Sequence, residues 1–191
     1  MNGRTVGDLR EQLHMGTCPG SGANGYTPVL RAERDKIVRG YFIGSSLLGV
    51  MLHWDERCMR LLPCRKDRSD CPYCLRGRPS QWKGYCAAAV WPSRARRVVE
   101  IPEGAYRACR ELLAKEGHLR GLWFELRRFP GPSNNAPVQV RLAEGAPIAQ
   151  IEDEWDILKS LLIFWGLSEE KRRALDTATL AQRLDDHGLE P

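Results

Sequence analysis

Hydrophobic and polar positions alternate in short blocks through the middle of this chain. Between residues 36 and 147, runs rich in β-branched, aromatic and aliphatic side chains are separated by Gly, Pro, Ser and charged residues, which is typical of strands joined by turns. A helix is expected over Gly104–Lys115, because apolar side chains recur at helical spacing between Pro102 and Gly117. The pattern predicts strands over residues 37–43, 47–54, 59–62, 82–91, 96–101, 119–129 and 138–142.

The order of these elements predicts the fold class. Three strands, a helix and two further strands are typical of the five-stranded Greek-key barrel called the OB-fold. Residues 55–81 would form an insertion between the first and second barrel strands. The prediction is a mainly β domain with helices over residues 36–147, an OB-like barrel that carries this insertion, whose strands are 47–54, 82–91, 96–101, 119–129 and 138–142.

The two ends of the chain differ from this middle part. Residues 1–35 are rich in turn formers around Pro19–Gly25 and predict a flexible N-terminal arm. Residues 148–191 predict an acidic, helical C-terminal region with helices over 152–166, 169–176 and 179–186. The first of these helices is amphipathic, and its apolar stripe either contacts a partner protein or packs on the barrel. The stripe comprises Trp155, Leu158, Leu162 and Trp165.

Composition and charge narrow the choice of function. The chain has 191 residues, of which 42% are hydrophobic, enough to form an ordinary core and to exclude disorder as the main state. Its net charge of +5 conceals an asymmetry, because residues 36–151 carry 20 basic and 10 acidic side chains whereas residues 152–191 carry 5 and 10. A basic middle part suggests a polyanionic partner, and the acidic end suggests a different contact.

The chain shows no pattern typical of an exported or membrane-spanning protein. No uncharged run reaches the roughly 20 residues that a membrane-spanning helix needs, and the first residues mix acidic and basic side chains where a signal peptide would be apolar. We therefore expect a cytoplasmic protein with no membrane partner. In a reducing compartment, its seven cysteines are more typical of metal ligands or buried thiols than of disulfides.

Three cysteines cluster in the polar insertion. Cys71 and Cys74 form a C-x-x-C turn that can aim both sulfurs at one ion, and Cys64 precedes them by seven positions. The insertion is therefore predicted to form a zinc knuckle inside the OB-like barrel. A structural zinc ion needs a fourth ligand, and His53 and Cys58 are the candidates. His53 is preferred, because it lies near the end of the strand that enters the insertion. The remaining cysteines are expected not to be ligands: Cys18, Cys86 and Cys109.

Cations and aromatic residues alternate through the basic part of the chain. Aromatic rings can stack on bases while Arg and Lys contact phosphates, a combination typical of single-strand binding grooves. Because alternate strand positions face opposite ways, Lys83 and Tyr85 are expected to line the groove with Arg96, although some aromatics must also fill the barrel. The candidate nucleic-acid-binding residues are Tyr41, Arg76, Arg78, Trp82, Lys83, Tyr85, Arg94, Arg96, Arg97, Trp123, Arg127 and Arg128.

The His/Cys spacing, inside a basic, aromatic and OB-like pattern and before an acidic C-terminal region, resembles the zinc-containing single-stranded-DNA-binding proteins of T4-like phages. In that family one His and three Cys hold a zinc subdomain inserted in an OB-fold, and an acidic tail recruits replication proteins. The resemblance implies a bacterial or phage-encoded protein whose C-terminal helices contact a replication or recombination protein. It also implies a zinc ion held by His53, Cys64, Cys71 and Cys74.

These observations together predict a non-enzymatic protein that binds single-stranded DNA and is stabilised by structural zinc. The alternatives are a zinc-containing adaptor that binds a protein partner and an RNA-binding protein, because stacking and phosphate contacts serve both nucleic acids. An enzyme is not expected, since the basic part has no clustered Asp/Glu set for catalytic magnesium, no Ser–His–Asp pattern and no P-loop.

Overall fold

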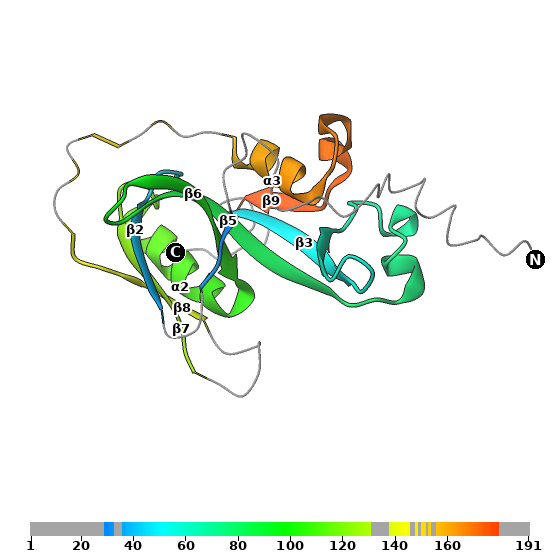
Figure 1. Cartoon of the computed structure of the whole chain (residues 1–191), viewed down its shortest axis with the longest axis horizontal. Coiled ribbons are helices and arrows are strands. Elements are labelled where there is room, and N and C mark those ends of the chain that lie inside the picture. Colours follow the sequence, from blue (N-terminus) through cyan, green and yellow to red (C-terminus); the bar gives the residue numbers. More distant parts are fainter. Residues whose placement is uncertain are drawn as a thin grey trace, which may run out of the picture.

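The structure, a computed structural model, describes residues 29–32, 36–130, 138–145, 148, 150, 151, 153 and 156–179. Within these residues nine strands form one open, mixed sheet (Figure 1). The strands are β1 (Val29–Leu30), β2 (Ile37–Phe42), β3 (Leu48–Asp55), β4 (Arg60–Pro63), β5 (Ser80–Val90), β6 (Ala95–Pro102), β7 (Trp123–Arg128), β8 (Val138–Leu142) and β9 (Thr177–Thr179). The helices are α2 (Glu103–Glu116) and α3 (Ile157–Trp165), with the 3-10 helices η1 (Arg68–Asp70), η2 (Cys74–Arg76) and η3 (Glu169–Ala174).

The long strand β5 organises the sheet. One of its edges pairs first with β3, from Ser80 to Tyr85, and then with β2, from Ala88 to Val90. Its other edge pairs with β6. Because β3 and β2 pair with different halves of the same edge of β5, the sheet divides into two parts. Strands β2, β7 and β8 extend the sheet next to the C-terminal half of β5, and β3, β4 and β9 extend it next to the N-terminal half.

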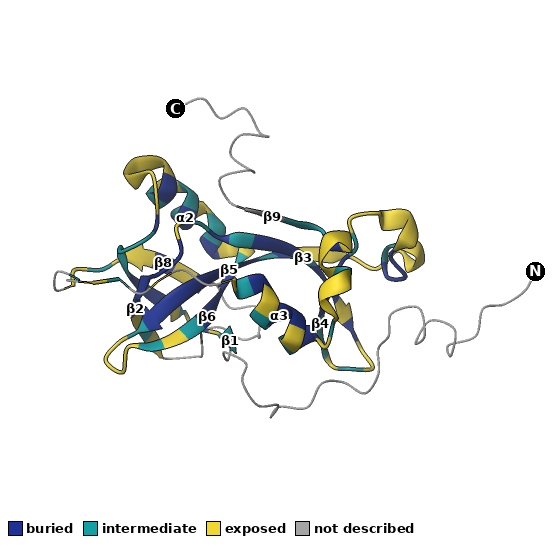
Figure 2. Ribbon diagram, turned by 90° about the horizontal axis from the view of Figure 1, so that it is seen from above, coloured by how far each residue is buried: buried dark blue, intermediate teal, exposed yellow. Residues whose placement is uncertain are grey.

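The two faces of β5 are covered by different helices. Trp82 packs edge-on against Tyr106 of α2, with ring centroids 4.5 Å apart, whereas Tyr85 packs against Trp165 of α3 at 5.9 Å. These two positions on β5 have opposite parity, so they point to opposite faces. Most of β5 is therefore buried, with α2 and α3 on its two sides (Figure 2).

The helix α2 lies in the curve of β2, β5, β6 and β7 (Figure 1). It buries Ala105, Cys109 and Leu113 against a core that includes Phe42 and Phe124. The expected helix is thus confirmed. Cys86 and Cys109 are buried free thiols in this core, away from the insertion.

The helix α3 packs on the other side of the sheet. Asp156 caps it by accepting hydrogen bonds from the backbone N–H groups of Leu158 and Lys159, which satisfies donors that the first turn leaves free. Its buried face belongs to a second core, shared with β3, β4 and the insertion. The apolar stripe, apart from Trp155, which lies outside the described residues, therefore packs on the protein's own sheet.

The mainly β fold with helices is confirmed, whereas the closed five-stranded OB-like barrel is not. The sheet is open, with β1 and β8 at the two ends of its main path, and a closed barrel has no such edges. The difference arises because β2, which the barrel prediction leaves out, lies between β5 and β7.

The end segments depart from expectation where the structure describes them. Val29–Leu30, in the expected arm, pair in parallel with β6, and the helix expected from residue 152 begins at Ile157. The second C-terminal helix is the short η3, and Thr179, the expected start of the third, ends β9, which pairs with β3. Residues 1–28 and 180–191 lie outside the description, so the three-domain division stays a prediction. No helix in the described ranges is long and apolar enough to cross a membrane.

Candidate metal centre and basic face

The insertion, residues 55–81, folds back so that distant cysteines approach β3. The strand β4 pairs antiparallel with the end of β3, which places Leu62 opposite His53. Cys64 follows directly, and its backbone N–H donates a 2.7 Å hydrogen bond to the carbonyl of Met51. The short helices η1 and η2 then turn the chain so that the C-x-x-C segment reaches Cys64.

Four potential metal ligands meet at this point. The sulfur of Cys64 lies 3.7 Å from that of Cys71 and 3.6 Å from that of Cys74, and the Cys74 sulfur lies 3.4 Å from Nε2 of His53. All four ligand atoms lie within 4.8 Å of one another. This group can hold a metal ion, and its fourth member is His53 rather than Cys58.

The surroundings of His53 prepare its ring for ligation. Its Nδ1 donates a 3.1 Å hydrogen bond to the carbonyl of Pro79, which leaves the lone pair of Nε2 facing the sulfurs. Burial lowers the pKa of His53, so the ring is neutral at physiological pH and able to bind a metal. The ring of Tyr73 stacks on that of His53 with centroids 5.2 Å apart.

The three thiols sit in different electrostatic settings. Burial raises the pKa of Cys64 well above the ordinary value, and burial also raises that of Cys74. Burial opposes ionisation of Cys71 as well, but hydrogen bonds from the backbone N–H groups of Arg65, Cys74 and Tyr73 outweigh it and lower its pKa. Cys71 therefore ionises more readily than the other two thiols, and a metal that binds the group would displace the thiol protons.

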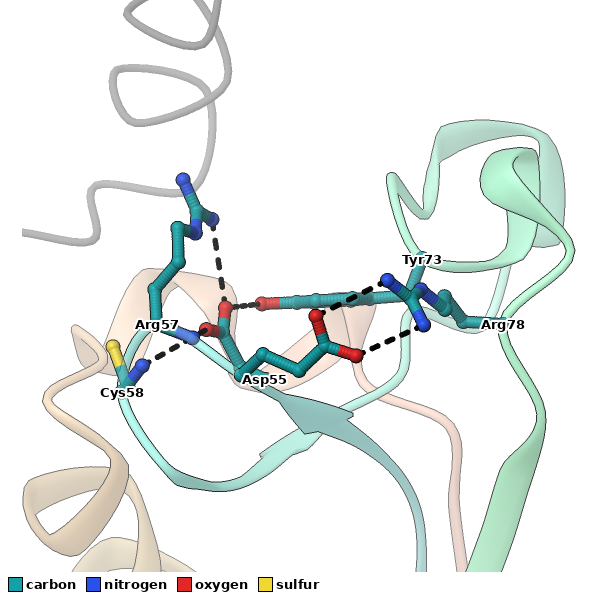
Figure 3. A network of polar contacts seen from close by, with 6 residues as sticks. Asp55, Arg57, Cys58, Tyr73 and Arg78 are labelled. Carbon is teal, nitrogen blue, oxygen red and sulfur yellow. Dashed lines mark hydrogen bonds and ion pairs between the residues drawn. The ribbon is translucent and has the colours of Figure 1, made fainter.

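A buried carboxylate connects the metal centre to the turn after β3 (Figure 3). Asp55, only 2% exposed, accepts a 2.6 Å hydrogen bond from the hydroxyl of Tyr73 and others from the backbone N–H groups of Arg57 and Cys58 at 2.8 and 3.0 Å. Burial alone would raise the pKa of Asp55, but these hydrogen bonds hold it below its ordinary value. The C-x-x-C turn is thus tied to β3 by Tyr73 as well as by the ligands.

We expect Tyr73→Phe to destabilise the fold by about 1–3 kcal/mol, because it leaves a buried carboxylate short of one donor. The loss is measured by urea denaturation at pH 7. Since the pKa of Asp55 is depressed in the folded state, this contribution is present above its unfolded pKa near 3.8 and is lost as pH falls through the lower folded value. Tyr106→Phe, a partly buried tyrosine on α2, serves as the control, and a loss no larger than the control's would contradict the expectation.

Three of the candidate stacking residues are buried, which corrects the prediction for them. Tyr41, Trp82 and Tyr85 are only 3%, 4% and 1% exposed, so their ring faces cannot meet a base. The indole of Trp82 covers Gly49 and Gly84, where an added Cβ would lie 2.3 and 2.6 Å from it. Trp82 and Tyr85 are covered by α2 and α3 on the two sides of β5, and Tyr41 belongs to a third core with Ala87 and Ala89, against which Ile148 and Ile151 pack.

Exposed arginines lie instead around this third core, on the face of β2 and β5–β8 opposite α2. Residues paired across antiparallel strands share a face of the sheet. Tyr41 pairs with both Ala89 and Trp123, and Ala89 pairs with Arg96. Trp123 and Arg96 therefore lie on the same face. Trp91 and Trp123 lie edge to face on it, with centroids 5.7 Å apart. We call this surface the arginine face; it comprises Arg39, Arg94, Arg96, Arg127 and Arg141, with Trp91 and Trp123.

Acidic residues offset only part of this charge. Glu125, 5% exposed, pairs with both Arg39 and Arg141, and hydrogen bonds from these two arginines, chiefly Arg141, lower its pKa. Arg127 lies over the ring of Phe129 at 5.3 Å. A cleft of about 390 Å³ adjoins the face, lined by Arg94, Arg96, Gln150, Ile151 and Asp153.

The other candidate residues lie elsewhere. Lys83 is mostly covered and pairs with the buried Glu100 at 3.5 Å. Arg97 and Arg128 pair with Ala88 and Val138, which places them on the face that α2 covers, and Arg76 and Arg78 lie on the insertion. Arg39, Arg141 and Trp91 lie on the arginine face but are not among the sequence-predicted candidates. The signal for Arg39 was its position between Val38 and Gly40 along β2.

Comparison of the chain with protein-family models, with curated proteins and with solved structures found no match. The chemistry of the two surfaces is therefore the basis for assigning a function.

Proposed function

We propose that this protein binds single-stranded nucleic acid, with DNA as the expected ligand, and that it does so without catalysis and with a structural zinc ion holding its insertion. The observation that carries the proposal is the arginine face. It brings five exposed arginines and two tryptophans to one side of a sheet, which is the combination that a flexible strand needs for phosphate contacts and base stacking.

The positions of the two helices and of the exposed Trp91 favour a single strand over a duplex. Readers of duplex DNA commonly place an exposed helix in the major groove, whereas α2 packs in the curve of the sheet and α3 packs on the second core. The exposed Trp91, 46% accessible, offers a ring to an unpaired base. The adjoining cleft of about 390 Å³ falls within the range of about 300–1,000 Å³ that encloses small ligands, so it can accommodate one nucleotide.

Zinc is the metal that the ligand set favours. One imidazole and three thiolates are a frequent structural zinc set, and tetrahedral zinc, with Zn–S of about 2.3 Å and Zn–N of about 2.0 Å, separates its ligands by roughly 3.8 Å for two sulfurs and 3.5 Å for sulfur and nitrogen. Cys64 lies 3.7 Å from Cys71 and 3.6 Å from Cys74, and Cys74 lies 3.4 Å from His53, with all four ligand atoms within 4.8 Å of one another. Four protein ligands fill the coordination sphere, which supports a structural role because catalytic sites keep an open position.

The resemblance to the zinc-containing proteins of T4-like phages supports the same combination of a His/Cys zinc site with a strand-binding β-sheet. As part of this proposal, we retain the inserted zinc knuckle and the OB-like relation in a modified form, with β2 as an additional strand between β5 and β7. A replication or recombination protein remains the proposed partner of the C-terminal region.

The proposal is tested by titrating the zinc-loaded protein with a fluorescein-labelled (dT)20 strand at two salt concentrations. We expect binding that weakens steeply with salt, and weaker binding of a matched duplex, because phosphate contacts release counterions. A (U)20 strand distinguishes DNA from RNA. Absence of binding to every strand would refute the function and favour the protein adaptor.

A further inference from the structure

A small hollow lies beside the metal centre, because its wall includes Tyr73, whose ring stacks on that of His53. Its volume is about 150 Å³, below the range of about 300–1,000 Å³ for pockets that enclose a whole small molecule. It therefore suits one group of a larger ligand. Its lining combines two aromatic rings with three cations and two acids: Trp54, Asp55, Glu56, Arg57, Tyr73, Arg76 and Arg78.

The metal ligands position this hollow. Tyr73, between the two cysteines of the C-x-x-C turn, forms part of its wall, with its ring on His53 and its hydroxyl on Asp55. The chain then continues from Cys74 through η2, which delivers Arg76 and Arg78 to the rim. Figure 3 shows the hydroxyl of Tyr73 directed at the carboxylate of Asp55, the contact of 2.6 Å.

The charges of the hollow favour an anion. Asp55 is already occupied by three hydrogen bonds from Tyr73 and the turn, and it pairs with Arg57 at 3.5 Å, so the cations that remain for a ligand are Arg76 and Arg78. Arg78 pairs with Glu56 at 3.1 Å, but both side chains are more than half exposed, and such surface pairs are weak enough to exchange partners. Arg76 is exposed and has no ion-pair partner in the part of the chain that the structure describes.

Trp54 adds a stacking surface at the edge of the hollow. It is 46% exposed, although tryptophan is usually well covered. An aromatic ring next to two available guanidinium groups can hold a base and its phosphate together. The hollow itself is too small for the base, which would rest on Trp54 outside it.

We propose that this hollow binds a phosphate group of a nucleic-acid strand, with the adjacent base on Trp54, and that the metal centre holds the hollow in shape. This inference rests on the proposed function and adds a second contact site to it, separate in sequence from the arginine face. Arg76 and Arg78 bind the phosphate, and Tyr73 connects the wall of the hollow to the metal ligand His53.

The test compares strand binding by zinc-loaded wild type, Arg76→Ala and Trp54→Ala, using fluorescein-labelled (dT)20. Arg76→Ala should weaken binding about 3- to 10-fold and lower the salt slope by about 0.7, the value for one phosphate contact on a single strand. Trp54→Ala should weaken it about 5- to 100-fold, as expected for loss of one stacked base. Arg107→Ala, an exposed arginine on α2, is the matched control and should leave affinity unchanged.

Metal content and inorganic phosphate complete the test. Both variants should keep one metal ion per chain. In metal-free protein the hollow loses its shape, so Arg76→Ala should not weaken strand binding any further. If wild type binds the strand and neither variant weakens it, this inference is overturned while the proposed function stands; if wild type binds no strand, both are overturned. A response to inorganic phosphate alone, with none to the strand, would also overturn the nucleic-acid assignment of the hollow.

Discussion

If the group of His53, Cys64, Cys71 and Cys74 holds the proposed zinc ion, removing that ion is expected to lower the melting temperature by roughly 8–16 °C. Zinc contributes about 10–16 kcal/mol to the folding of small zinc-binding peptides. Here the insertion is also held by apolar packing, because Cys64, Cys71 and Tyr73 belong to the second core. We therefore expect a smaller loss, on the order of 4 kcal/mol, and 1 kcal/mol corresponds to about 2–4 °C for a chain of this size.

The physical reason is that metal-free protein must keep three thiols and an imidazole close together without the ion that satisfies them. Cys71→Ser should produce the same loss and reduce the bound metal. Cys109→Ala, which changes a buried thiol of α2 outside the group, is the matched control and should retain full metal content. The measurements are metal analysis of the purified protein and thermal unfolding with and without a chelator. Full stability without any bound metal would contradict the assignment.

Charge reversal on the arginine face should nearly abolish strand binding. The double variant Arg94→Glu, Arg96→Glu removes two cations beside the cleft, which are the proposed phosphate contacts, and adds repulsion. We expect a loss on the order of 100-fold at low salt, with the salt slope reduced by about 1.4, because each phosphate contact on a single strand contributes about 0.7. Stability should change little, because both side chains are exposed.

The control for this prediction is Arg107→Glu, Lys115→Glu on α2, which changes net charge by the same amount at exposed positions. Binding is followed by fluorescence anisotropy at several salt concentrations. Equal losses in the two double variants would mean that only net charge matters, and the arginine face would then not be a binding site.

The metal group could be predicted from local sequence because most of it is local. Cys64, Cys71 and Cys74 lie within eleven positions, and the C-x-x-C spacing by itself brings two sulfurs together. The choice between His53 and Cys58 depended on β4, whose pairing with β3 returns the chain beside His53. Strand pairing of this kind depends on the packing of both strands, so the sequence left two candidates.

Which aromatic residues are exposed was predicted less well, and the reason is burial. Composition indicated cations and aromatics, and Arg94, Arg96, Trp123 and Arg127 do lie on the arginine face. Alternation along β5 predicted that one face of that strand meets solvent. Only the tertiary structure shows that α2 covers one face and α3 the other, which buries Trp82 and Tyr85.

The sequence by itself therefore determined the β-rich class, the position of α2 and the cysteine cluster, because each depends on periodicity or spacing over a few residues. The tertiary structure decided the open sheet, the position of β2 between β5 and β7, and the docking of α3 on the second core. It also decided which arginines share a face. These features depend on contacts between segments far apart in the chain, where many alternative pairings satisfy the same local pattern and only simultaneous packing of all the elements selects one.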